Sequence, residues 1–191
     1  MEIFDALLGR ESVSPKHLIA PAPGEAERQR AFQAAMTAPD HGALRPWRFL
    51  VVEGEGLQRL AEVYGESVRR AEPGADPAVI EVAREKALRS PLLIVCAAVT
   101  RDAHPKVPPV EQLVAASCAT QNLLTAFHAM GYGAMLVTGP RAYDAYVKEQ
   151  LGLAPADQII GFMHVGTPSP ERAPKPKKRP EQAHHVRLWP A

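Results

Sequence analysis

An uninterrupted apolar run lies near the middle of the chain, Leu92-Leu93-Ile94-Val95-Cys96-Ala97-Ala98-Val99, between Pro91 and a polar, proline-rich loop at 102–109. Its length suits a β-strand. A strand with one face in water would alternate apolar and polar residues, and this run does not, so we expect it to be covered on both faces. Both faces of its sheet then need covering helices. The run therefore predicts a layered domain of the α+β or α/β class.

Further helices and strands are expected on both sides of this run. Apolar residues at helical spacing predict helices at 3–9, 23–36, 57–71, 77–88, 110–130 and 142–151, and short apolar segments predict strands at 48–53, 134–138 and 158–165. The helix at 110–130 is apolar on most sides, so we expect it to be central. Residues 12–24 hold three prolines and are expected to be an extended connection. Because helices separate the strands, we expect a mixed sheet.

The length of the chain, 191 residues, suits one domain with an arm. We expect residues 1–168 to form that domain. Residues 169–191 are proline-rich and basic, too polar to fold alone, and are expected to extend as an arm across a partner subunit.

Charge and hydropathy argue against nucleic-acid and membrane partners. The net charge is +1, which gives no overall field to attract a polyanion or an anionic membrane. No apolar run approaches the roughly 20 residues that span a bilayer, and the first residues lack the features of a signal peptide. Cys96 and Cys118 lie in apolar segments and are expected to be reduced core residues. A cytoplasmic protein is predicted.

Several familiar catalytic patterns are absent from the sequence. No strand is followed by G-x-G-x-x-G, and there is neither a P-loop nor a G-x-S-x-G elbow. His184 and His185 are adjacent, so their side chains diverge, and no nearby cysteine or carboxylate set completes a zinc site. We therefore expect no metal site and no nucleophilic side chain, and chemistry that a cofactor carries out.

Four segments, taken in order, resemble the nitroreductase superfamily and in particular its small single-domain bacterial subgroup. They are Leu7-Leu8-Gly9-Arg10-Glu11-Ser12-Val13; Ala38-Pro39-Asp40-His41 with Pro46-Trp47-Arg48-Phe49; His104-Pro105-Lys106-Val107-Pro108 with Glu111-Gln112; and Gly131-Tyr132-Gly133 to Gly139, followed by Ile159-Ile160-Gly161-Phe162 and Val165-Gly166-Thr167-Pro168. Each motif is weak alone, but their order and spacing together are specific.

The resemblance implies a fold and a reaction. The fold is an α+β, three-layer sandwich with a mixed central sheet flanked by helices. The activity is that of an FMN-dependent NAD(P)H oxidoreductase, reducing nitroaromatics, quinones or similar acceptors by ping-pong hydride transfer. The family works as homodimers with the active site at the subunit interface. The flavin N5 carries the chemistry, so no protein side chain is expected to be catalytic.

The resemblance also places the FMN phosphate and ribityl chain near the N-terminus. Arg10, Glu11 and Ser12 match that element, and a guanidinium and a hydroxyl are suitable phosphate ligands. Glu11 stands where relatives commonly have a basic residue, so its contribution would come from its backbone. The alternative for Arg10 and Ser12 is an ordinary surface arginine and capping serine. Ser14 stands where many relatives place a lysine near the flavin pyrimidine edge.

Other cofactor contacts follow from the same resemblance. His41 matches a flavin contact supplied by the partner subunit, unless it is a solvated loop histidine. Thr37 stands where the closest subgroup has an arginine. Leu136, Val137 and Thr138 match the strand beneath the flavin, although Leu136 and Val137 also suit a core.

Two further segments complete the expected set. Lys178 and Arg179 match a basic motif that reaches the FMN phosphate, or are part of a solvated charge run. A weaker NAD(P) assignment, for which a plain helix end is the alternative, covers Ala126, Phe127, His128, Ala129, Met130 and Gly131.

The sequence leaves three functional alternatives open. The same fold could carry another flavin reaction, such as reductive dehalogenation, flavin fragmentation or dehydrogenation. It could also bind flavin with little turnover, because Glu11, Ser14 and Thr37 weaken the usual polar set. A non-enzymatic binding protein that uses the basic arm at 175–179 is the third. Neither the electron acceptor nor the preference for NADH or NADPH can be read from the sequence.

Overall fold

The computed structural model describes residues 2–101, 104–172 and 179–190 and has the expected α+β class. Short 3-10 turns lie at Pro15–His17, His41–Ala43 and Gln182–His184. The helices are α1 (Ile3–Gly9), α2 (Glu25–Ala35), α3 (Glu55–Ala71), α4 (Pro77–Glu85), α5 (Pro109–Ala129), α6 (Pro140–Tyr143) and α7 (Ala145–Gln150). The strands are β1 (Leu18–Ile19), β2 (Trp47–Glu53), β3 (Leu92–Ala98), β4 (Gly133–Val137) and β5 (Gln158–Pro168).

The five strands form one sheet in which β1, β5, β3 and β2 follow one another, and β4 also pairs with β5. All four ladders are antiparallel, so the expectation of a mixed sheet is wrong for the strands of this chain. Within the described residues, parallel pairing occurs at an isolated bridge between Ser12 and Ala134. The pattern of apolar residues predicts that a strand exists but not the direction in which it runs.

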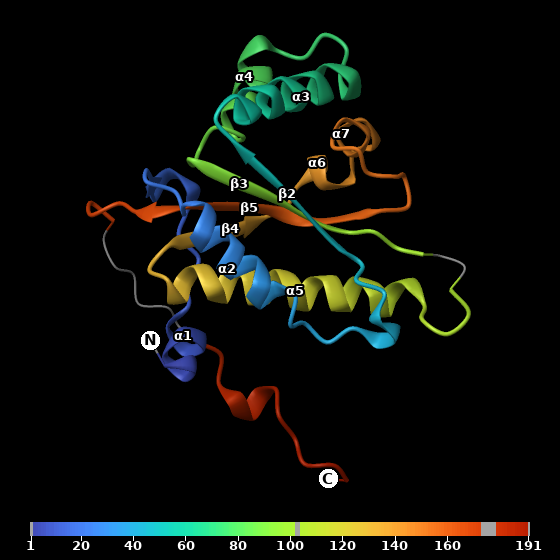
Figure 1. Cartoon of the computed structure of the whole chain (residues 1–191). Helices are drawn as coiled ribbons and strands as arrows, with labels where there is room; N and C mark the ends of the chain where they lie inside the picture. Colours follow the sequence, from blue (N-terminus) through green and yellow to red (C-terminus); the bar gives the residue numbers. More distant parts are fainter. Residues whose placement is uncertain (1, 102–103, 173–178, 191) are drawn as a thin grey trace.

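Strand β3 is buried on both faces, as its sequence predicts, with every residue from Leu92 to Ala98 at most 1% exposed. Alternate side chains point to opposite faces of the sheet. Leu92, Ile94 and Cys96 face a core shared with α2 and α5, and Leu93, Val95 and Ala97 face a core shared with α3, α6 and α7. Figure 1 shows the resulting three layers, with α3, α4, α6 and α7 on one face and α2 and α5 on the other.

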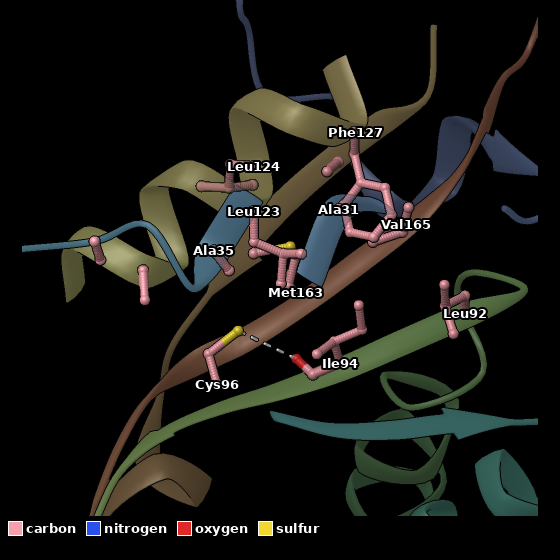
Figure 2. Close-up of a cluster of buried hydrophobic side chains, with 13 residues drawn as sticks. Ala31, Ala35, Leu92, Ile94, Cys96, Leu123, Leu124, Phe127, Met163 and Val165 are labelled. Atoms are coloured by element: carbon pink, nitrogen blue, oxygen red, sulfur yellow. Dashed lines mark hydrogen bonds between the residues drawn. The ribbon is translucent and has the colours of Figure 1, made fainter. Parts of the chain in front are cut away.

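The core beneath α5 is closely packed. Figure 2 shows Phe127, Leu123 and Leu124 of α5 reaching toward Met163 and Val165 of β5. Small alanines of α2, Ala31 and Ala35, let that helix approach the same cluster, and both are wholly buried. Helix α5 is therefore central, as expected, and it fixes the position of the residues at its two ends.

Three local expectations need correction. The helix expected at 142–151 is two helices, because Asp144 is extended and its Oδ1 accepts hydrogen bonds from Tyr146 N at 2.8 Å and Val147 N at 3.4 Å, capping α7. The connection at 12–24 contains the short strand β1, and β5 runs on to Pro168 because β1 pairs with its end.

Among the described residues no helix is both long and apolar enough to cross a bilayer.

Strand β4 lies very close to its neighbours because two glycines leave room for it. A Cβ on Gly161 would lie 2.8 Å from Leu136 Cδ1 and 2.9 Å from the Val137 carbonyl oxygen. A Cβ on Gly133 would lie 2.7 Å from Leu18 Cδ2 and 3.0 Å from Val13 Cβ. These glycines therefore set the position of β4 between β5 and the N-terminal segment.

We expect Gly161→Ala to lower the free energy of unfolding by about 1–3 kcal/mol, the range for overpacking a core. The added methyl would displace the backbone of β4. Urea unfolding followed by circular dichroism measures the change. The matched control is Gly56→Ala in helix α3, because its Cβ would lie an ordinary 3.4 Å from Val52 Cγ1 of β2. Equal stability of the two variants would contradict this account of β4.

Candidate functional site

The loop after α1 lies along the outer edge of β4. Val13 N donates a 3.0 Å hydrogen bond to the Ala134 carbonyl oxygen, and Ser12 forms a parallel bridge with Ala134. The Ser12 side chain is exposed, and Arg10 is half-buried beside it. The loop therefore presents a guanidinium and a hydroxyl together at one edge of the sheet.

Beyond this bridge, β4 offers backbone groups to a ligand. Ala134 directs its carbonyl away from β5, because that oxygen accepts from Val13. Backbone direction alternates along a strand, so Leu136 and Thr138 also point their N–H and C=O groups outward. The Leu136 and Val137 side chains pack partly against the two cores, and Thr138 is exposed. The side chains of Leu136 and Val137 therefore belong to the cores, while the outward backbone groups of Leu136 and Thr138 can bind a ligand.

The C-terminal segment returns to the same edge and changes its charge. Glu11 forms an ion pair with Arg172, so its carboxylate is neutralised within the chain. Arg179 Nη2 donates to the Leu8 carbonyl at 2.9 Å and to the Arg10 carbonyl at 2.7 Å. Three arginines, Arg10, Arg172 and Arg179, minus one glutamate leave two positive charges here. Lys178 lies outside the described residues.

The end of α5 closes this site from another side. A Cβ on Gly9 would lie 3.4 Å from His128 Nε2, so the histidine touches the end of α1. Burial lowers the pKa of His128, Arg10 lowers it further, and Glu11 partly offsets them. The imidazole therefore adds no charge at neutral pH to the arginines beside it.

The segment expected to contact NAD(P) is the end of α5 and the turn after it. Phe127 is wholly buried in the core, which removes it as a contact. Ala126, Ala129 and Met130 line an open groove of about 670 Å³ together with Arg30 of α2. Gly131 has φ of +90° and ends the helix.

The two remaining expected contacts lie at other points along α5. His41 Nδ1 is 2.6 Å from Glu111 Oε2 in the first turn of α5, beside an apolar hollow of about 270 Å³. Thr37 accepts a 3.3 Å hydrogen bond from Asn122 Nδ2 near the middle of the helix. Glu111 and His128 are separated by roughly 25 Å at the helical rise per residue. One chain therefore cannot bring His41 to Arg10 and Ser12.

Exposed apolar side chains mark the face of α5 that nothing covers in a single chain. Val110 and Val114 are 63% and 57% exposed, and Ser117 and Gln121 continue the same stripe. Helix α1 is also exposed, with Phe4 at 72% and Leu8 at 74%. These exposed apolar side chains on α5 and α1 are candidates for a contact with a second molecule.

A second cluster of polar residues lies on the other face of β4, around a small cavity of about 50 Å³. His164 of β5 faces it and is 3% exposed. Its Nδ1 is 2.8 Å from Ser90 Oγ, and that hydroxyl donates to the Leu92 carbonyl at 2.9 Å. Burial, reinforced by Arg89, lowers the pKa of His164 to about 4. His164 is consequently a neutral imidazole at physiological pH.

We expect His164 to make stability depend on pH below neutrality. Its folded pKa is about 4 and its ordinary pKa is 6.5, so the unfolded chain takes up the proton first as pH falls. The stability present above pH 6.5 is lost between 6.5 and 4, by about 3 kcal/mol at the most. Urea unfolding at several pH values, comparing wild type with His164→Gln, isolates this loss. The exposed control His184→Gln should keep the wild-type pH profile, and an unchanged slope in His164→Gln would refute the assignment.

No group of three or more metal-ligating side chains exists within the described ranges. Sequence reasoning missed Arg172, which pairs with Glu11, and it missed the cavity residues Lys86 and Arg141. The basic, proline-rich C-terminal arm indicated in general that a positive charge such as Arg172 could return to the site. No signal could have joined Lys86 to Arg141, which are far apart in the chain and come together only through the sheet.

Comparisons with known proteins identify the family and the fold. A family model described as "Nitroreductase family" matches residues 8–167. "Putative NAD(P)H nitroreductase YdjA" of Escherichia coli K12 is 36% identical over 168 residues, which are 88% of this chain and 89% of that protein. A nitroreductase-like protein from Bacillus cereus has a TM-score of 0.80 at 22% identity, over 100% of this chain and 97% of that one. A mutant of the FMN and NADPH-dependent nitroreductase NfnB from Sphigopyxis sp. strain HMH has a TM-score of 0.77 at 18% identity, over 100% of both chains.

Proposed function

The chain belongs to the nitroreductase family and is an oxidoreductase of that type, and from this premise we propose that it is an FMN-dependent NAD(P)H reductase. The observation that carries the proposal is the edge of β4, where a cationic loop and free backbone groups lie in line. The Escherichia coli relative is named for NAD(P)H and NfnB for FMN and NADPH, which supports both cofactor classes.

The charges at the N-terminal loop fit the phosphate of FMN. A phosphate monoester carries close to two negative charges at neutral pH. Arg10, Arg172 and Arg179 together with Glu11 leave two positive charges. Arg10 would bind phosphate oxygens as a bidentate donor and Ser12 would donate a further hydrogen bond. Arg172 acts indirectly, because it prevents Glu11 from repelling the anion, and the Glu11 side chain is no direct ligand.

The strand edge fits the flat ring of the cofactor. Thr138 and Leu136 would offer backbone N–H donors to the polar edge of the ring, while the side chains of Leu136 and Val137 anchor the strand in the two cores. Gly139 has φ of +150°, and a Cβ built on it would meet nothing within 4 Å, so its backbone can be approached closely.

When bound, FMN supplies the redox chemistry by taking a hydride from NAD(P)H and passing it to an acceptor in a ping-pong sequence. The protein binds and orients the reactants and excludes water. Acceptors of the proposed class are nitroaromatics, quinones and activated alkenes. The groove lined by Ala126, Ala129, Met130 and Arg30 is a place where part of NAD(P)H could bind.

We propose a homodimer that completes each site with residues of both chains. Antiparallel packing of two α5 helices along the exposed stripe would bring His41 of one copy toward His128 of the other. Two-fold symmetry then gives two equal sites. The arm at 169–191 would pack on the partner, because Leu188 and Trp189 are 90% and 93% exposed in the single chain. Figure 1 shows the end of this arm extending away from the layers beyond α1. Unpaired Cys96 and Cys118 are in keeping with the reducing cytoplasm.

The proposal predicts that the purified protein binds FMN and that Arg10→Met weakens binding at least tenfold, through loss of a charged phosphate ligand. Quenching of FMN fluorescence on titration measures the affinity. Arg59 is an exposed arginine of α3 on the opposite face of the sheet, so Arg59→Met is the control and should bind as wild type does.

The absorbance spectrum of the wild-type complex completes this test. Flavin bands that bleach anaerobically on addition of NADPH or NADH would establish the reductase. A chain that fails to bind FMN at saturating concentration would exclude it and favour a binding protein that uses the basic arm. FMN binding without bleaching would favour a flavoprotein with little turnover or another reaction.

The dimer proposal predicts that Val114→Asp yields monomers with weaker FMN binding. A carboxylate in the middle of the α5 stripe would be buried without a partner at the interface. Multi-angle light scattering measures the mass. Val79 on α4 is similarly exposed, at 52% against 57% for Val114, so Val79→Asp is the matched control and should remain dimeric. Monomeric wild-type protein that still bleaches with NADPH would contradict an active site shared between subunits.

A further inference from the structure

The cavity on the far face of β4 is lined by two positive charges that form no ion pair within the described chain. Its lining includes two cations, Lys86 and Arg141, and no carboxylate. Neither cation forms an ion pair with a described acidic residue. The Asp144 carboxylate is nearest to Arg141 in sequence, but it caps α7 and accepts from Ser67 Oγ. No carboxylate therefore contacts either cation, although Asp144 acts on Arg141 at longer range.

The buried position of Arg141 leaves one of its hydrogen-bond donors unsatisfied. Its Nε is buried and has no hydrogen-bond partner within the described residues. Its guanidinium lies 5.0 Å from the ring centroid of Tyr64, which is 3% exposed. Burial lowers the pKa of Arg141, partly offset by Tyr64 and Asp144. A buried donor left unmet is unfavourable, so a missing acceptor is a reasonable explanation for it.

The cavity adjoins the strand edge described above. Thr138 and Gly139 line it, and these residues end the edge along which the flavin ring is placed under the proposed function. Ser14, which stands where many relatives have a lysine, brings no charge of its own. Because Thr138 and Gly139 line the same cavity as Lys86 and Arg141, a ligand seated on the end of β4 would lie close to both cations.

The chemistry of the ring supplies the missing negative charge. A hydride brings two electrons and one proton to N5, and NAD(P)H leaves as NAD(P)⁺. The ring, neutral when oxidised, then carries one negative charge on its pyrimidine part unless a second proton follows. Cations beside the ring favour this reduced form over the oxidised form.

We propose that Lys86 and Arg141 are the residues that stabilise the reduced, anionic flavin in this protein and so set its reduction potential. This inference rests on the proposed function and assigns roles to two residues outside the sequence motifs. His164 remains neutral in the same cavity and adds no charge to theirs. Tyr64 holds the Arg141 guanidinium in place through its ring face.

The test measures the two-electron potential of bound FMN by anaerobic titration with a reference dye, together with the affinity for oxidised FMN. Lys86→Met and Arg141→Met should each lower the preference for reduced over oxidised FMN about tenfold, which makes the potential more negative by about 30 mV. The affinity for oxidised FMN should change less than about twofold. The matched control is Arg70→Met, since Arg70 lies 3.9 Å over the ring of Tyr146 outside the cavity, and it should leave the potential unchanged.

The outcomes separate this inference from the proposed function. Wild-type protein that binds FMN, with potentials unchanged in both cavity variants, would overturn the role of Lys86 and Arg141 and leave the reductase standing. Wild-type protein that does not bind FMN would overturn both. If Arg141→Met loses its circular dichroism signal, Lys86→Met decides alone, because Lys86 is exposed and its loss removes charge without opening the core.

Discussion

Burial of β3 on both faces forces helices onto both sides of the sheet, and the position of every other element follows from it. Its partner β5 is drawn into the same two cores, with Met163 on one side and Phe162 on the other. The edge of β5 that faces away from β3 pairs with β4. Beyond the bridge at Ala134, the outer edge of β4 pairs with no other strand of the described chain. In a sheet whose centre is closed by side chains, such an edge is where backbone groups can meet a ligand.

The charged groups beside that edge come from both ends of the chain. The loop after α1 bridges to Ala134, and Arg172 and Arg179 come back from the C-terminal segment. Glu11 would repel a phosphate if it stood alone, and its ion pair with Arg172 neutralises that charge. An unfavourable residue at a motif position therefore need not abolish binding, because a charge from a distant part of the chain can compensate for it.

The hydrophobic pattern predicted where the helices and strands lie, but not how the strands pair. The run from Leu92 was enough to predict a strand covered on both faces, and it proved so. Strand direction and the break at Asp144 were missed, because the first depends on pairing and the second on one capping side chain. For the site, Arg10 and Ser12 could be proposed from a local motif. The presence of Lys86 and Arg141 at one cavity has no local signature, since only the folded sheet brings them to it.

The two groups of cations would act differently on an elongated ligand. Under the proposed function, charges at Arg10, Arg172 and Arg179 would act on a phosphate whose charge is the same before and after reduction, so they would contribute equally to binding both forms. Charges at Lys86 and Arg141 would act on a ring that becomes anionic only when reduced, so they would contribute to one form alone. Binding shared by two states sets affinity, and only differential binding shifts the equilibrium between them. On this reasoning, the loop determines whether the cofactor is retained and the cavity determines how readily it is reduced.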